Sequence, residues 1–208
     1  NKPLMKLISL SALLIFFMSI IGIPAHSQKM QWGKMMGSVK EEYALNHVVD
    51  CAGNIYISGK TTGDIGGKNL GINDGFLIKL DSSGNKIWSR QFGSAGDEDI
   101  QWSAIDNSGN IYIVGSSTGT IAEKNCGKED LIIVKYTPEG EKIWNLQIGS
   151  DSTDIAKGIC TDSRGNIYVT GSKFNPEKPK GTAELAKIVK KIKTPVLAIG
   201  GIGLGNIP

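Results

Sequence analysis

Short runs of alternating apolar and polar residues, separated by glycine-containing turns, cover most of the chain. One run begins at Ile55-Tyr56-Ile57, and β-branched and aromatic residues of this kind are typical of strands. Residues 76–80 and 87–92 form two further runs, and residues 100–105 form the fourth. Turn-forming residues bound each run, so the pattern predicts four successive antiparallel strands.

The same pattern returns with a fixed interval of 56 residues, which identifies a tandem repeat. The stretch D-x-x-G-N-I-Y-[IV]-x-G occurs three times in this register, beginning at Asp50, Asp106 and Asp162. The tryptophans keep the same interval, at Trp32, Trp88 and Trp144. Four strands in a unit of this length are the content of a propeller blade. The sequence therefore predicts an all-β fold of tandem four-stranded, propeller-type blades.

The number of repeats is too small for a closed ring. Residues 30–173 supply about two and a half units, whereas propellers close with about four to eight blades. Each repeat needs a neighbour to bury its faces. We therefore expect an incomplete propeller that depends on self-association or on a longer parent chain.

The repeated polar and aromatic residues have two interpretations each. The carboxylates of Asp50, Asp106 and Asp162 could belong to a calcium loop, but the alternating oxygen ligands and distant Glu of such a loop are missing. We therefore expect each Asp to cap its own turn. The tryptophans could be a stacking platform for a ligand, but one per unit in a strand register favours packing between blades.

These motifs together resemble the bacterial beta-propeller repeat family called SBBP. The resemblance is carried by the D-x-x-G-N-I-Y-[IV]-x-G stretch, by a D-x-x-x-x-K-[LY] strand and by a G-[NE]-K-I-W strand, and it covers about residues 30–173. It implies a propeller scaffold of exported and cell-surface proteins, and it carries over no catalytic residue.

The register ends near Phe174, and a different pattern follows. Residues 175–181 are a turn-rich connector, and Thr182 is placed as a helix N-cap. Apolar residues then recur at helical spacing, which predicts a helix over residues 185–192. Pro195 ends that helix, and residues 196–199 form the short apolar run of a buried parallel strand.

This C-terminal α/β segment resembles part of a TIM barrel, the late portion of thiamine-phosphate synthase and its relatives. The match is carried by P-V-x-A-I-G-G-I, in which the strand runs directly into two glycines. The resemblance implies that Gly200 and Gly201 offer backbone N–H groups to a phosphate. A spurious join between two genes and an unrelated capping helix are the other interpretations of residues 175–208.

The N-terminal segment predicts export. Met5-Lys6 is followed by an apolar run over residues 7–23 and by Ala25-His26-Ser27, which matches a signal peptide cleaved after Ser27. A membrane anchor is the competing interpretation, but Gly22 and Pro24 suit a signal peptide better. We therefore divide the chain into residues 1–27 as a signal peptide, 28–174 as repeats and 175–208 as the connector, helix, strand and Gly-Gly turn.

Charge narrows the class of partner. The chain has a net charge of +3, but residues 28–174 hold 15 basic and 18 acidic side chains. A slightly acidic body argues against nucleic acid as a partner. No cysteine or histidine spacing of a zinc site and no catalytic constellation is present, and His47 is the one histidine that follows the predicted signal peptide.

These observations predict an exported, non-enzymatic repeat protein that acts as a binding or structural module outside the cell or at its surface. We expect no catalytic residue, no metal and no cofactor. The partner is an unknown protein or glycan, and no stable membrane span remains after signal cleavage. The alternatives are a thiamine-phosphate synthase-like transferase fragment and a chimaeric sequence.

Overall fold

A computed structural model describes residues 32–122, 124–172 and 196–199. Two compact units make up the chain, Asn1–Gly33 and Lys34–Pro208, and every described strand belongs to the second unit. The described residues contain strands and turns without any helix, which confirms the all-β prediction for this part. The helix predicted over residues 185–192 lies outside the described residues.

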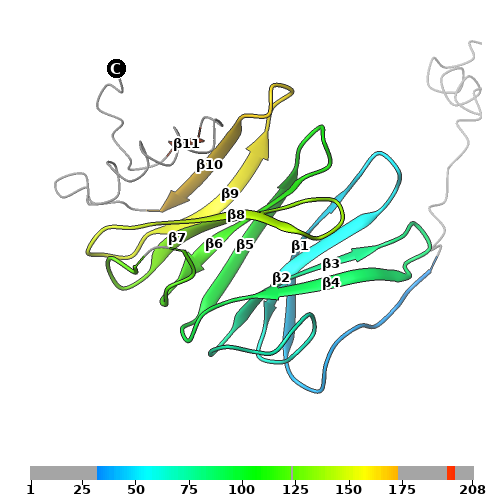
Figure 1. The fold of residues 1–208 in the computed structure, drawn as a ribbon, viewed down its shortest axis with the longest axis horizontal. Helices are drawn as coiled ribbons and strands as arrows, with labels where there is room; N and C mark the ends of the chain where they lie inside the picture. The colour runs from blue at the N-terminus through cyan, green and yellow to red at the C-terminus, as the bar shows by residue number, and fades with distance from the viewer. Residues whose placement is uncertain (1–31, 123, 173–195, 200–208) are drawn as a thin grey trace, which may run out of the picture. The chain divides into compact units, whose positions relative to one another are not determined.

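The strands form three sheets (Figure 1). The first two sheets are four-stranded antiparallel meanders in which neighbours in sequence are neighbours in space. The first contains β1 (Glu42–Val49), β2 (Ile55–Thr61), β3 (Asp74–Leu80) and β4 (Lys86–Phe92). The second contains β5 (Glu98–Ile105), β6 (Ile111–Ser117), β7 (Asp130–Tyr136) and β8 (Lys142–Ile148). These are the predicted tandem blades, and they do not close into a ring.

The sheet boundaries differ from the repeat boundaries suggested by the four runs of the first unit. The fourth run, residues 100–105, lies in β5 and opens the second sheet, because it pairs with β6 across the Asp106 turn. Its counterpart in the first sheet is β1. The two strands even share a bulge, at Ala44/Asn46 and at Ile100/Trp102.

The third sheet departs from the other two. It contains β9 (Ile155–Thr161), β10 (Ile167–Ser172) and β11 (Val196–Ile199), in the order β11-β10-β9. The β9–β10 pair is an antiparallel hairpin like those of the first two sheets. Strand β11 confirms the strand predicted over residues 196–199, and it pairs with β10 in the parallel sense. A parallel pair requires a crossover of a dozen or more residues between its strands.

Apolar side chains join the sheets face to face. Between the first and second sheets, Tyr56, Leu77 and Phe92 pack against Ile111, Ile113, Ile132, Val134 and Tyr136. Between the second and third sheets, residues of the opposite face take part, among them Tyr112, Val114 and Ile133, which meet Ile159, Ile167 and Val169. Burying one such side chain contributes about 1.5–3 kcal/mol. Each sheet is therefore stabilised by the sheets that flank it.

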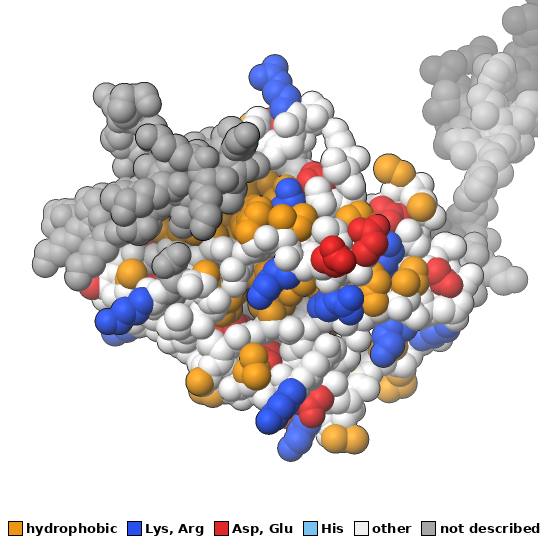
Figure 2. All heavy atoms as spheres, in the orientation of Figure 1, with side chains coloured by type: hydrophobic (Ala, Val, Ile, Leu, Met, Phe, Trp, Pro, Cys, Tyr) orange, Lys and Arg blue, Asp and Glu red, His pale blue; other side chains and the backbone are white. Residues whose placement is uncertain are grey.

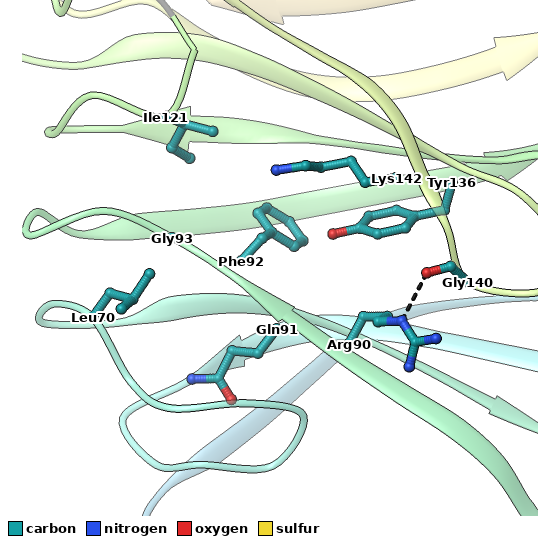
Figure 3. A pocket seen from close by; sticks show the side chains of 9 residues that line it. All are labelled: Leu70, Arg90, Gln91, Phe92, Gly93, Ile121, Tyr136, Gly140 and Lys142. Carbon is teal, nitrogen blue, oxygen red and sulfur yellow. Dashed lines mark hydrogen bonds between the residues drawn. The ribbon is translucent and has the colours of Figure 1, made fainter.

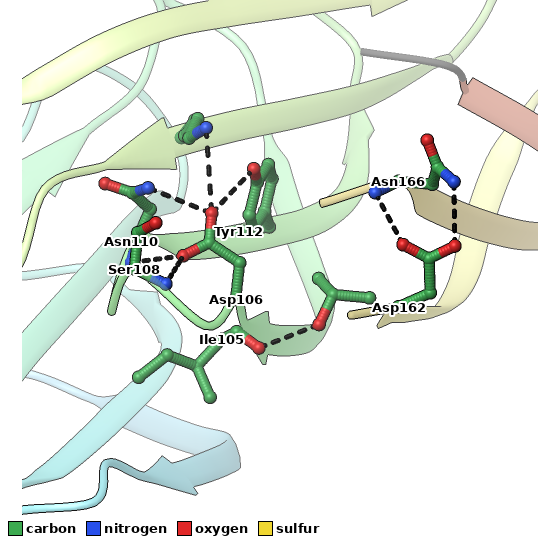
Figure 4. Close-up of polar contacts among 9 residues, drawn as sticks. Ile105, Asp106, Ser108, Asn110, Tyr112, Asp162 and Asn166 are labelled. Atoms are coloured by element: carbon green, nitrogen blue, oxygen red, sulfur yellow. Dashed lines mark hydrogen bonds and ion pairs between the residues drawn. The ribbon is translucent and has the colours of Figure 1, made fainter. Parts of the chain in front are cut away.

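The first strands of successive sheets also exchange hydrogen bonds. Asn46 Oδ1 in β1 accepts from the backbone N–H and the hydroxyl of Ser103 in β5, at 3.2 and 2.6 Å. The Thr161 hydroxyl in β9 donates to the Ile105 carbonyl in β5 at 2.8 Å (Figure 4). These bonds fix the register between sheets, which apolar packing alone would leave free to slide.

The hairpin turns that begin at Asp50, Asp81, Asp106 and Asp162 are each held by that aspartate. Asp106 Oδ1 accepts from the backbone N–H groups of Ser108 and Asn110, both at 2.9 Å, while Oδ2 accepts from the Asn110 amide and the Tyr112 hydroxyl (Figure 4). Gly109 completes the turn with a φ of +80°, a conformation that glycine adopts without steric cost. Burial opposes the charge of Asp106, but the donors outweigh it and lower the pKa of this carboxyl.

Buried carboxylates occupy the corners between sheets. Asp130, which begins β7, is 1% exposed, and Asp154 is 5% exposed. Asp130 Oδ2 accepts from Cys126 N–H and the Gln147 amide, and Asp154 Oδ2 accepts from Ser150, but the Oδ1 atom of each has no hydrogen-bond donor among the described residues. Burial and the neighbouring charge of Asp154 raise the pKa of Asp130.

We expect Asp130→Asn to increase the thermal stability at neutral pH, with a gain that shrinks as the pH falls. Folding raises the pKa of Asp130. The contribution of this side chain to the stability of the folded state is therefore fully present below the unfolded pKa and is lost as the pH rises through the folded pKa. The turn aspartates have lowered pKa values, so their contribution to stability changes with pH in the opposite direction. The variant and the parent chain are therefore always compared at the same pH. Thermal unfolding from about pH 3 to about pH 8 measures the difference. The exposed control Asp151→Asn should leave the profile unchanged, and a parallel downward shift for Asp130→Asn at every pH would contradict this account.

We expect Asp106→Ala to lower the free energy of unfolding by about 2–3 kcal/mol, because it removes the acceptor of two backbone N–H groups and of the buried Tyr112 hydroxyl. Asp81→Thr is the matched control, since Thr137 stands at the equivalent position of the second sheet and its hydroxyl accepts the same two N–H bonds. This change should cost less than about 1 kcal/mol in urea denaturation. Equal losses for the two variants would show that the turn carboxylate does not act through these bonds.

Candidate functional site

The turn carboxylates are structural. Both oxygens of Asp50, Asp106 and Asp162 accept hydrogen bonds within their own hairpins, which confirms the prediction of turn capping. Residues 32–122, 124–172 and 196–199 contain no group of three or more His, Cys, Asp or Glu side chains placed to hold a metal ion.

Trp88 and Trp144 pack inside the array, as predicted. Each is partly buried against an apolar cluster between sheets. Trp88 meets the Tyr56 ring edge-on at 6.0 Å, and Trp144 meets Tyr112 in the same way at the same distance. Trp32 belongs to the other compact unit.

The turn between β7 and β8 is clamped by side chains of the first sheet. Lys79 Nζ and Trp88 Nε1 both donate to the Pro138 carbonyl, at 3.0 and 3.2 Å. Arg90 Nε donates to the Gly140 carbonyl at 2.7 Å, and its guanidinium lies 5.4 Å from the Trp88 ring. These contacts hold the second sheet against β4 and form one wall of a pocket.

That pocket lies at the junction of the first two sheets and is the candidate functional site (Figure 3). It has a volume of about 360 Å³, within the range of small-molecule sites. Strand β4 and the loops that precede β3 and β7 contribute to it, together with the end of β7 and the start of β8. The lining residues are Leu70, Arg90, Gln91, Phe92, Gly93, Ile121, Tyr136, Gly140 and Lys142.

The pocket combines an apolar floor with cationic groups. The Phe92 and Tyr136 rings lie 6.2 Å apart and are almost fully buried, and Figure 3 shows Leu70 and Ile121 on the side opposite Tyr136. Arg90 and Lys142 supply two positive charges, and no acidic residue of the described ranges lines the pocket. On the face drawn in Figure 2, by contrast, basic and acidic side chains are interspersed.

Sequence reasoning did not identify this pocket. Arg90 lies outside the repeated motifs, whereas Tyr136 and Lys142 lie inside the D-x-x-x-x-K-[LY] and G-[NE]-K-I-W motifs, which we interpreted as strands of the scaffold. A comparison of the repeats with one another could have indicated the site, because two of its residues differ from their counterparts. At the 56-residue interval, Arg90 aligns with Leu146 and Tyr136 aligns with Leu80. Two of the lining side chains, Arg90 and Tyr136, are therefore not shared by the neighbouring repeat.

The other residues considered from the sequence fall elsewhere. His47 is exposed on β1, away from the pocket lining. Gly200 and Gly201, the predicted phosphate-binding residues, lie outside the described residues. The described part of the chain contains no helix with the length and hydropathy needed to cross a lipid bilayer.

Comparison with known proteins finds two families in different parts of the chain. The beta-propeller repeat SBBP matches residues 87–121 and 143–172. Thiamine monophosphate synthase matches residues 163–208, so this similarity begins inside the last repeat and includes both β10 and β11.

Curated relatives show the same division. An uncharacterised WD repeat-containing protein of Acanthamoeba polyphaga mimivirus is 23% identical over 67% of this chain. Regulatory protein FlaEY of Caulobacter vibrioides is 26% identical over 55% of the chain. Thiamine-phosphate synthase of Anaeromyxobacter dehalogenans is 40% identical over 26% of the chain.

The chain spans only a small part of each of these relatives, 13%, 13% and 24% of their lengths in the same order. The SBBP matches cover most of β4 in the first sheet, β5, β6 and most of β8 in the second sheet, and the β9–β10 hairpin of the third sheet. Residues 87–121 and 143–172 thus match the beta-propeller repeat SBBP, and residues 163–208 match thiamine monophosphate synthase.

Proposed function

We propose that the chain is an exported, non-enzymatic β-propeller repeat protein that acts as a binding module at the cell surface or outside the cell. The observation that carries this proposal is the pocket between the first two sheets, where an apolar floor adjoins unpaired cationic groups. A rigid stack of sheets is well suited to hold such a pocket open, because both walls are anchored in buried apolar clusters.

Export is supported by the first 27 residues. Their short basic start, their apolar run and their small residues before Gln28 have the order of a signal peptide. The partner that suits this location is a protein or a glycan. The acidic balance of residues 28–174 disfavours nucleic acid.

A second candidate function follows from the C-terminal match. The 40% identity to a thiamine-phosphate synthase supports a phosphate-binding role for Gly200 and Gly201, which follow β11 directly. The parallel β10–β11 pair is the arrangement of an α/β barrel rather than of a blade. A chimaeric origin of residues 163–208 would explain the same match without any phosphate binding.

We expect a full-length chain expressed in a bacterial host to leave the cytoplasm and to lose about its first 27 residues. Leu13→Arg, which places a charge in the apolar run, should retain the chain in the cytoplasm at its full mass. Leu45→Arg is the matched control, because the same change at an exposed position of β1 should leave export intact. Cell fractionation with intact-mass spectrometry reads out all three chains. A cytoplasmic, unprocessed parent chain would refute the export proposal.

Phosphate binding by the C-terminal segment distinguishes the second candidate. If the segment acts as in thiamine-phosphate synthase, inorganic pyrophosphate should perturb the backbone amide signals of Gly200 and Gly201 in the full chain. Gly201→Val should then weaken binding at least about 10-fold by blocking close approach of the backbone. Gly109→Ala, a glycine with positive φ in a hairpin turn outside residues 163–208, serves as the control for general destabilisation. We expect no binding if the binding-module function is the correct one.

A further inference from the structure

The unused side-chain groups among the described residues of the pocket lining can all donate a hydrogen bond. Gln91 is satisfied, because its Oε1 accepts from Gly66 N–H and its Nε2 donates to the Gly63 carbonyl and to Asp74 Oδ2. The carboxylate of Asp74 therefore stands behind the Gln91 amide rather than in the pocket lining. What remains for a ligand comes from Arg90, Tyr136 and Lys142.

Arg90 has donors to spare. A guanidinium carries five N–H groups. Three of its bonds are made to the carbonyls of Gly140, Ser89 and Glu139, at 2.7, 2.9 and 3.5 Å, and these anchor the side chain. Among the described residues Arg90 forms no ion pair. Its charge and its remaining N–H groups are therefore uncommitted within the described residues, and Arg90 is one of the residues that line the pocket.

Tyr136 supplies a hydroxyl without a partner. The residue is 3% exposed, and no hydrogen bond joins its hydroxyl to any residue of the described ranges, but this oxygen is not one of the fully buried unpaired polar atoms. Figure 3 shows this hydroxyl pointing into the pocket, toward the Phe92 ring. Burial raises the pKa of Tyr136, so the hydroxyl keeps its proton at neutral pH and can donate it.

Lys142 adds a second positive charge at the rim. It is exposed, and its ammonium group makes no ion pair or hydrogen bond to the part of the chain that the structure describes. Figure 3 shows its side chain extending over Phe92, on the side of the pocket opposite Arg90. A group bound between these residues would meet donors from two sides and an apolar surface beneath.

We propose that this pocket binds a carboxylate carried on an apolar or aromatic body, with the carboxylate between Arg90, Tyr136 and Lys142. The donors satisfy an anion that has only acceptors, and the Phe92, Leu70 and Ile121 side chains cover its apolar part. A free organic acid and the C-terminus of a peptide that ends in an aromatic residue share this chemistry. The inference deepens the proposed binding function by naming the class of ligand.

Titration of the full chain with 4-phenylbutyrate, followed by amide chemical shifts in NMR spectra, tests the proposal. We expect a dissociation constant of about 1 mM or lower, with the largest shifts at residues 90–93 and 136–142. The neutral analogue 4-phenylbutanol should bind at least about 10-fold more weakly, because it lacks the charge that the donors recognise. A peptide ending in Leu-Phe with a free carboxylate, compared with its C-terminal amide, forms the second arm.

Two variants attribute the binding to the pocket. Tyr136→Phe keeps the buried ring and should weaken carboxylate binding about 10-fold, and Lys142→Gln should weaken it by about 3-fold or more in low salt. Lys86→Gln is the matched control, because Lys86 stands at the position equivalent to Lys142 in the first sheet and does not line this pocket. Tyr112→Phe controls for a lost tyrosine hydroxyl elsewhere.

The outcomes separate the sources of the carboxylate. Tighter binding of the peptide acid than of 4-phenylbutyrate supports a peptide C-terminus, and the reverse supports a free acid. Equal affinity for acid and alcohol, or the absence of shifts at the pocket with both acids, would overturn the proposal. Failure of export would refute the proposed function while leaving carboxylate binding in solution intact, so the two failures are distinguishable.

Discussion

Face-to-face burial of successive sheets is the constraint on which this structure depends. The two larger apolar clusters lie between sheets, so each four-stranded meander buries most of its apolar side chains against its neighbours, while Phe76, Ile78 and Leu80 form a smaller cluster on the first sheet alone. The buried face of one sheet, with Tyr56, Leu77 and Phe92, meets the opposite face of the next. The 56-residue repeat is the sequence record of this requirement, because every unit must present both faces in the same register.

Polar groups then convert this packing into a defined arrangement. The Asp106 carboxylate closes its hairpin, and Tyr112 links the turn to the apolar face on which it packs. Asn46 and Ser103 bind one sheet to the next at a fixed offset. Turn, strand and neighbouring sheet are therefore coupled, and a site between two sheets inherits their rigidity.

The candidate pocket depends on departures from the repeat. Arg90 replaces the leucine found at this position in the second sheet, and its bonds to Gly140 and Glu139 clamp the facing turn while leaving charge toward the pocket. Tyr136 occupies a position that holds Leu80 in the first sheet and brings a hydroxyl into an apolar layer. The repeated residues thus form the sheets, and the residues that differ between repeats, Arg90 and Tyr136, supply polar groups to the pocket.

The sequence by itself determined the strands, the turns with Gly53 and Gly109 at positive φ, and the strand at residues 196–199, because these follow from local periodicity and turn chemistry. Tertiary structure alone decided that residues 100–105 open the second sheet, that Asp130 and Asp154 share a buried corner, and that Arg90, Tyr136 and Lys142 line one pocket. These relations join residues that are far apart in the chain. They depend on how two sheets pack, and a local pattern does not encode that packing.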